Sequence, residues 1–451
     1  MNLPLDLLAL SVVPRVEAKA ALRLTCRAMR RTVDECASQL TWCNPLQRPT
    51  LPLSLSTALP AGCSRGVKLL DCSALKGSLV SLVGCPSTTQ ALMCGGTQVA
   101  HLGPLAACVE LHTLHCNQAL VSHLEALAAC TRLQAFHCNS TRVADLGPLA
   151  ACTALLTLHC SQTQVADLGP LKACTGLRTL HCSQTRISDL GPLAACRRLL
   201  TLHCNGTCVA DLGPLAACTG LQALHCDGTR VTDLGPLTAC AGLTILSCCN
   251  TPVAHLDPLA ACMRLQTLLC GYSEVTELGP LAACVELQTV DCYTTRVADL
   301  GPLSACLRLQ TLRCGSTRVA GLGPLSKCMG LRTLHCSDTL VADLGPLASC
   351  MGLTTLICSG APVADLGPLA ACVELQTLSC GFTQVADVTP LAACTGLVNL
   401  DCYITAVADL APLAACVHLV KVMCDERVPV WQAQQLRSTC VNLEHVIRVR
   451  K

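Results

Sequence analysis

The sequence repeats itself every 22 residues over most of its length. Segments 162–182, 184–204 and 206–226 share the pattern TxVxDLGPLxACxxLxTLHC, with Ile187 in place of Val and Ala223 in place of the second Thr. One series of cysteines keeps this spacing from Cys72 to Cys424 without an insertion and marks 17 units. A period of this length is typical of stacked similar units, and a chain of 451 residues exceeds the size of one hydrophobic core. The repeat therefore predicts a solenoid.

Each unit contains the pattern of one short strand. Leu180 and Cys182 alternate with Thr179 and His181, so that the two pairs point to opposite faces. Strands of successive units are expected to stack in parallel, about 4.8 Å apart. Pro192 follows where the chain has left the strand, so its missing N–H removes no bond between strands.

The repeat resembles a known family. Segment 177–187, LRTLHCSQTRI, resembles the leucine-rich-repeat core LxxLxLxxNxL, with Cys in the third apolar position and Thr in place of Asn. Together with the DLGPL segment that follows, it is similar to the 22-residue class of bacterial internalins and phosphatase-regulating repeat proteins. The resemblance covers about residues 67–424. It implies an α/β repeat solenoid, a leucine-rich-repeat arc with a parallel concave β-sheet.

The Thr at the end of each strand occupies the position where the family uses Asn to bond the backbone of the turn. A hydroxyl can make that bond more weakly. Ala119 and Ala361 interrupt the column, so we expect their turns to lack the side-chain bond.

The chain contains 40 cysteines, most of them at positions that the repeat turns inward. A buried free thiol behaves as a small apolar group, and many equivalent thiols could not specify one disulfide pairing. We interpret them as reduced core residues and expect a cytoplasmic or nuclear protein. A disulfide framework or a zinc site is the alternative.

Residues 1–45 lack the repeat. They open LPLDLL and continue to LRLTCRAMRR at 22–31, which resembles an F-box. The resemblance implies a small helical segment that docks on the Skp-type adaptor of a cullin-RING ubiquitin ligase. The residues that would make this contact are Leu3, Pro4, Leu7, Leu8, Leu24, Cys26 and Arg27. Met29 replaces the usual Trp, and 11–19 is poor in leucine, so the alternative is a plain N-terminal cap.

Residues 46–66 read as a connector. Residues 425–451 read as an atypical last unit that caps the array, with Trp431 as an apolar cover.

Composition argues against several function classes. The net charge is +2 without a long run of one sign, which disfavours nucleic acid as a partner. No uninterrupted apolar stretch is long enough to cross a bilayer, and 1–14 carries Asp6 but no Lys or Arg, unlike a secretion signal. We find no catalytic constellation and predict no cofactor, no metal and no enzymatic activity. We expect a monomer apart from its complex.

Two sets of residues are candidates for partner binding. The first is a column of histidines on the concave face: His115, His137, His159, His181, His203 and His225. Such a column could bind a metal or an acidic segment, or change charge near pH 6.5, or it could be one tolerated residue copied by repeat expansion. The second set is aromatic and follows the strands: Tyr272, Tyr293, Phe382 and Tyr403. Exposed aromatic residues are favoured interface anchors, although these could simply cover the next loop.

These observations leave two hypotheses. The chain is the substrate-recognition subunit of an SCF-type ubiquitin ligase, with the adaptor on residues 3–42 and a protein on the concave sheet. Alternatively, it is a non-ligase interaction scaffold or a phosphatase-regulator-like repeat protein.

Overall fold

A computed structural model describes residues 68–72, 77, 80–83, 85–440 and 442–449, together with the backbone of two short strands, β1 (Gln39–Thr41) and β2 (Leu53–Ser54). The F-box-like contact residues, from Leu3 to Arg27, lie outside the described residues. The chain divides into two compact units, 1–221 and 222–451, and each is described by itself.

The first unit contains a parallel sheet built from one strand per repeat. In addition to β1 and β2, its strands are β3 (Leu69–Asp71), β4 (Val80–Ser81), β5 (Ala91–Met93), β6 (Thr113–His115), β7 (Ala135–His137), β8 (Thr157–His159), β9 (Thr179–His181) and β10 (Thr201–His203). β1 pairs with β3, and β3 with β5. From β5 to β10, each strand pairs with the next at a register of 22 residues. β2 and β4 form a separate pair.

The second unit continues the same pattern of parallel strands. Its strands are β11 (Ala223–His225), β12 (Ile245–Ser247), β13 (Thr267–Leu269), β14 (Thr289–Asp291), β15 (Thr311–Arg313), β16 (Thr333–His335), β17 (Thr355–Ile357), β18 (Thr377–Ser379), β19 (Asn399–Asp401), β20 (Lys421–Asp425) and β21 (His445–Val449). The pairing register is again 22 residues from β11 to β20.

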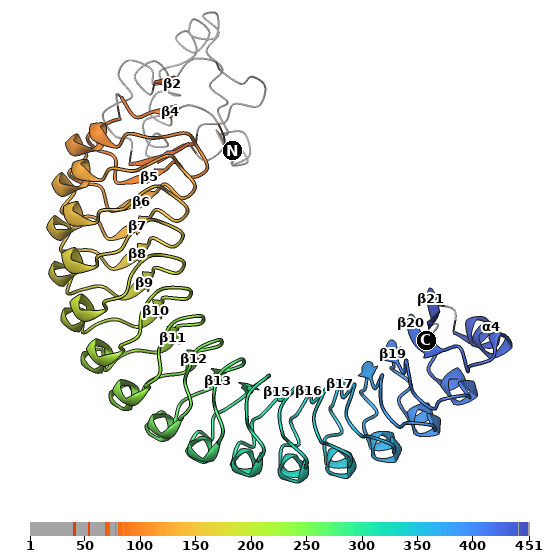
Figure 1. Ribbon diagram of the computed structural model, residues 1–451. Helices are drawn as coiled ribbons and strands as arrows, with labels where there is room; N and C mark the ends of the chain where they lie inside the picture. The colour runs from red at the N-terminus through yellow and green to blue at the C-terminus, as the bar shows by residue number, and fades with distance from the viewer. Residues whose placement is uncertain are drawn as a thin grey trace, which may run out of the picture. The chain divides into compact units, whose positions relative to one another are not determined.

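Between strands, each repeat returns through one turn of 3-10 helix. In the first unit these helices are η3 (Gly103–Ala107), η4 (Glu125–Ala129), η5 (Gly147–Ala151), η6 (Gly169–Ala173), η7 (Gly191–Ala195) and η8 (Gly213–Ala217). In the second they are η9 (Gly235–Ala239), η10 (Asp257–Ala261), η11 (Gly279–Ala283), η12 (Gly301–Ala305), η13 (Gly323–Lys327), η14 (Gly345–Ser349), η15 (Gly367–Ala371), η16 (Thr389–Ala393) and η17 (Ala411–Ala415). Within each unit the strands line the inner edge of the ribbon and the 3-10 helices its outer edge (Figure 1). The predicted leucine-rich-repeat solenoid is confirmed.

The local sequence explains the 3-10 turns. Most begin at Gly-Pro, where proline supplies a helical φ and lacks only an N–H that has no partner in a first turn. In the consensus units the preceding aspartate stabilises the start, because the Asp189 Oδ1 accepts the Gly191 N–H at 2.6 Å. The helix buries one leucine, Leu193, which becomes the outer wall of the core.

The two cysteine columns lie in that core, as the repeat predicts. The column after the strands is fully buried, and burial raises the pKa of the Cys160 and Cys292 thiols to about 12. The column after the 3-10 helices is buried too, and its thiols bond to backbone carbonyls of earlier repeats. The Cys284 Sγ donates to the Leu259 oxygen at 3.3 Å and lies 3.6 Å from the Cys262 oxygen. The Cys thiol can donate a weak hydrogen bond to these carbonyls, which a Val or Ala side chain cannot do.

The threonine column makes the predicted turn bond. The Thr185 Oγ1 donates to the Cys182 carbonyl at 2.6 Å, and its side chain is buried. At Ala119 and Ala361, which have no hydroxyl, the backbone N–H donates to the equivalent carbonyl at 3.1 and 3.2 Å. These turns lack the side-chain bond, as predicted, but their carbonyl is still satisfied.

The last residues depart from the repeat. Helix α4 (Val430–Thr439) replaces the 3-10 turn and buries Ala433 and Leu436. Trp431 is 59% exposed, so the expectation that it covers the core is wrong. It lies in the first turn of α4, where the helix turns its alanine and leucine inward instead. Within the described residues, no helix combines the length and apolar character that crossing a membrane requires.

Candidate functional site

The inner face of the first unit carries five stacked imidazoles. His115, His137, His159, His181 and His203 occupy the same position on β6 to β10. Successive ring centroids lie 4.0, 4.2, 3.9 and 4.0 Å apart, and the rings of the first and third pairs are nearly parallel. The predicted column is confirmed as a contiguous stack because parallel strands in register keep equivalent residues side by side. In the second unit, His225 and His335 stand on separate strands.

Burial and crowding keep two of these rings, His137 and His159, neutral at pH 7. Burial, and to a smaller extent the nearby His115 and His181, lower the pKa of His137 to about 4. The same causes, burial first, lower the pKa of His159 to about 4. A change of charge near pH 6.5, one of the possibilities for the column, is therefore not expected of these two rings. At neutral pH they present an uncharged polar surface.

This stack predicts acid sensitivity of the first unit. Because the folded pKa of His137 and His159 lies below the ordinary 6.5, the unfolded chain binds protons more readily. The contribution of the neutral rings to the free energy of unfolding is fully present above about pH 6.5 and declines as the pH falls toward 4. After allowance for solvent screening of half-buried groups, the expected loss is on the order of 1 kcal/mol per ring.

Chemical denaturation at pH 7 and at pH 4.5 measures this loss. The double variant His137→Gln, His159→Gln should show a smaller difference between the two pH values than the unmodified protein. The matched control is His101→Gln, His123→Gln, which changes two exposed histidines outside the stack and should leave the difference unchanged. If the stack variant and the unmodified protein lost the same free energy of unfolding between pH 7 and pH 4.5, the lowered pKa of His137 and His159 would be contradicted.

The inner face of the second unit is chemically varied. The position of the histidines is taken in turn by Ser247, Leu269, Asp291, Arg313, His335, Ile357, Ser379, Asp401 and Met423. The Asp291 carboxylate lies 3.8 Å from the Arg313 guanidinium, and Ser379 donates to Asp401 at 2.9 Å. Neighbouring strands therefore present different groups, which a uniform column cannot do.

The four predicted aromatic residues meet in two pairs at the turns that follow the strands. The Tyr272 and Tyr293 ring centroids lie 5.6 Å apart at 57°, and those of Phe382 and Tyr403 lie 5.5 Å apart at 88°. These are favourable geometries for aromatic pairs. Tyr272 is 60% and Phe382 59% exposed, whereas Tyr293 and Tyr403 are partly buried.

Both pairs are built in the same way. The Asp291 Oδ1 accepts the Tyr293 N–H at 3.0 Å, and the Asp401 Oδ1 accepts the Tyr403 N–H at 3.1 Å. A glycine precedes the first ring of each pair. A Cβ at Gly271 would lie 3.2 Å from both the Tyr293 carbonyl and the Asp291 Oδ1. The site is thus a Gly-aromatic step followed, one repeat later, by Asp-Cys-Tyr.

The two copies are separated by five repeats. Sequence reasoning found the rings but missed the aspartates and glycines that hold them. The sequence does contain this pattern twice. A Gly-aromatic dipeptide stands at 271 and at 381, and the tripeptide DCY follows at 291 and at 401. Identical construction at two places identifies them as two equivalent sites.

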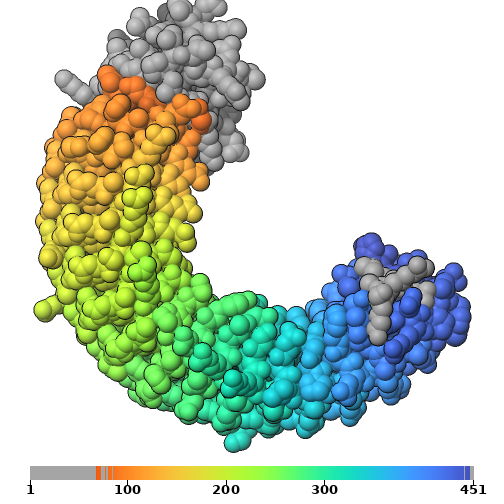
Figure 2. Space-filling model, in the orientation of Figure 1, coloured from red at the N-terminus to blue at the C-terminus, as the bar shows by residue number. Residues whose placement is uncertain are grey.

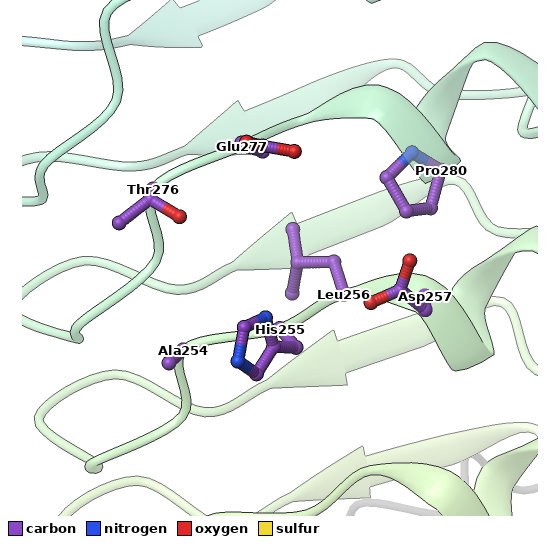
Figure 3. A pocket seen from close by; sticks show the side chains of 7 residues that line it. All are labelled: Ala254, His255, Leu256, Asp257, Thr276, Glu277 and Pro280. Carbon is purple, nitrogen blue, oxygen red and sulfur yellow. The ribbon is translucent and has the colours of Figure 1, made fainter.

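A small pocket lies elsewhere in the second unit. It has a volume of about 110 Å³ and is lined by Ala254, His255, Leu256, Asp257, Thr276, Glu277 and Pro280. Figure 3 shows that these residues come from two successive return segments. Small-molecule sites usually enclose about 300 to 1,000 Å³, so this pocket is too small to be one. In the part of the chain that the structure describes, no group of three or more His, Cys, Asp or Glu is arranged to hold a metal ion.

Comparison with known proteins supports the fold assignment. No family model matches the sequence, and no curated protein matches it. Among solved structures, the internalin InlF from Listeria monocytogenes is 23% identical, with 64% of this chain and 86% of that chain covered and a TM-score of 0.63. The functional domain of InlJ from the same organism, which includes a cysteine ladder, is 20% identical, covers 75% and 68%, and has a TM-score of 0.59.

The ectodomain of the plant receptor kinase GASSHO1/SCHENGEN3 from Arabidopsis thaliana is also similar. It is 15% identical, with 93% of this chain and 54% of that chain covered and a TM-score of 0.70. These likenesses, together with the strand register and the 3-10 returns, show that the chain has the leucine-rich-repeat fold with 22-residue repeats.

Proposed function

We propose that this chain binds another protein through the inner face and strand-end turns of its second unit, and that it acts without catalysis. The observation that carries the proposal is the pair of equivalent aromatic sites, Tyr272 with Tyr293 and Phe382 with Tyr403. Each pair joins one exposed ring to one partly buried ring at the end of a strand. Aromatic side chains placed in this way bury much area in an interface while fixing few torsions, which is typical of binding hot spots.

The position of the aromatic pairs, in turns at the ends of successive strands, favours a macromolecular partner. Figure 2 shows a flank of the second unit, on which the rows of successive repeats form a continuous surface. A flat surface with protruding rings suits contact with a protein better than enclosure of a small molecule. The GASSHO1/SCHENGEN3 ectodomain, of the same fold, was solved in complex with CASPARIAN STRIP INTEGRITY FACTOR 2.

The finer role that we propose is substrate recognition in an SCF-type ubiquitin ligase. It rests on the F-box-like sequence of residues 3–31, which would hold a Skp-type adaptor while the repeats hold the protein to be modified. In this arrangement the chain contributes positioning only. Many buried thiols favour a reducing compartment, so we place the protein in the cytoplasm or the nucleus.

Co-purification with the adaptor tests this role. A tagged full-length chain should recover a Skp-type adaptor from a eukaryotic lysate, and the variant Leu3→Ala, Pro4→Ala, Cys26→Ala, Arg27→Ala should lose at least nine-tenths of it. The control Arg230→Ala changes an exposed arginine in a repeat and should recover the adaptor normally. If the unmodified chain recovers no Skp-type adaptor, the ligase role is wrong and the hypothesis of a non-ligase scaffold is favoured.

A further inference from the structure

The second unit exposes an unbroken stripe of apolar side chains on the rim opposite the aromatic pairs. In each repeat one residue follows the buried cysteine of the 3-10 turn and lies in the turn that precedes the strand. In six consecutive repeats that residue is apolar, and its exposed fraction lies between 51% and 69%. The stripe consists of Met263, Val285, Leu307, Met329, Met351 and Val373.

Equivalent positions in the first unit are mostly polar. Thr131, Thr153, Thr175 and Arg197 occupy four consecutive repeats there. The apolar run therefore does not follow from the repeat itself, which accepts threonine at this position. Successive repeats stack in register, so the six side chains form one row along the second unit.

The exposed area is large for a surface that remains in water. Six such side chains present on the order of 600 Å², the upper end of what monomeric proteins leave exposed in one patch. Charged side chains flank the stripe, and with them the patch approaches the roughly 800 Å² per partner that specific interfaces bury.

We propose that this stripe is a homodimer interface, occupied by the same stripe of a second copy of the chain. A patch that meets itself must do so about a two-fold axis. An axis lying between the rows of Leu307 and Met329 brings all six rows into contact. It places Leu307 against Met329 of the second copy, Val285 against Met351, and Met263 against Val373.

Charge complementarity supports this axis. The residue after each stripe position is Arg264 in the first row and Glu374 in the last row, and both are exposed. The two-fold axis sets Arg264 of one copy opposite Glu374 of the other, twice per dimer. In the rows nearer the axis, Arg308 faces Gly330 of the second copy and Glu286 faces Gly352. The two glycines leave room for the Arg308 and Glu286 side chains, which form an ion pair with each other within one copy.

The aromatic pairs stay free in such a dimer, because they lie in the turns at the other ends of the strands. The sequence predicts a monomer, because apolar residue type alone does not tell an exposed side chain from a buried one. The exposure of the stripe residues in the structure is the reason to expect a dimer.

Light scattering after size exclusion tests the proposal on the full-length chain. The unmodified protein should have the mass of a dimer at about 20 µM, and Met329→Glu should have that of a monomer. Met329 is the most exposed residue of the stripe, so the substitution should leave the circular dichroism spectrum unchanged. The matched control Thr175→Glu, at the equivalent position of the first unit, should remain dimeric.

A charge exchange tests the axis separately. Arg264→Glu and Glu374→Arg should each weaken dimerisation about 10-fold, and the two together should restore it. A monomeric unmodified protein, or a Met329→Glu protein that stays dimeric, would overturn the proposal. If the double variant dimerised no more tightly than the two single variants, the proposed position of the two-fold axis would be wrong.

Discussion

The double variant Tyr293→Ser, Tyr403→Ser is expected to bind the protein partner about 1,000-fold more weakly than the unmodified chain. Each tyrosine forms half of an exposed aromatic pair, and loss of one such hot-spot residue costs about 2 kcal/mol, or about 30-fold in affinity. The two sites stand five strands apart, which is about 24 Å along the sheet. Residues at that distance share no contacts, so the two losses should add.

The fold should survive these changes. Both tyrosines lie in turns outside the leucine and cysteine core, and their N–H groups, not their rings, make the bonds to Asp291 and Asp401. The control is Leu340→Ser, which removes a 62% exposed apolar side chain from an equivalent turn that has no aromatic pair. Quantitative pull-down, followed by titration with the recovered protein, measures the effect. Equal yields from the double variant and the control would refute the aromatic sites as anchors.

The second large effect is expected in the core of the first unit. Phe136 is fully buried on β7, in register with Leu114 and Leu158 on the neighbouring strands. Phe136→Ala should lower the free energy of unfolding by about 3 to 5 kcal/mol, because the cavity cannot close against rigid neighbouring rows. In a solenoid each repeat contacts only its neighbours, so the loss should concentrate in the rows on either side of β7.

A second variant, Phe136→Leu, tests whether a smaller apolar side chain can fill the space of the ring. Phe136→Leu restores the residue that the adjacent strands carry and should cost less than about 1.5 kcal/mol. Urea denaturation measures both variants, and hydrogen exchange locates the loss. If Phe136→Ala proved as stable as Phe136→Leu, the ring would not be packed as the structure has it.

The sequence predicted the repeated part of the molecule well, because one physical rule acts in every unit. A strand buries alternate side chains, so Leu180 and Cys182 had to face inward once the 22-residue spacing was known. The threonine bond at Thr185 followed from the position of the family's asparagine. These features depend on local pattern, which the repeat displays many times over.

Features that depend on contact between repeats were harder to predict. The role of Asp291 depends on a glycine one repeat earlier and on a tyrosine two residues later, which no single unit reveals. The pKa of His137 depends on its neighbours in the stack. The exposure of Met329 and of Trp431 also escaped prediction, because residue type alone does not tell an exposed apolar side chain from a buried one.

Thiol labelling of the native protein, read out for each cysteine by mass spectrometry, tests the central structural claim most directly. Burial of the columns predicts that Cys160, Cys182 and Cys292 stay unlabelled until the chain is denatured, and that all three then react as free thiols. The exposed Cys208 serves as the internal control and should label at once. Rapid labelling of the three column residues in the native state, or their recovery as disulfides, would contradict a dry interior shared by all repeats.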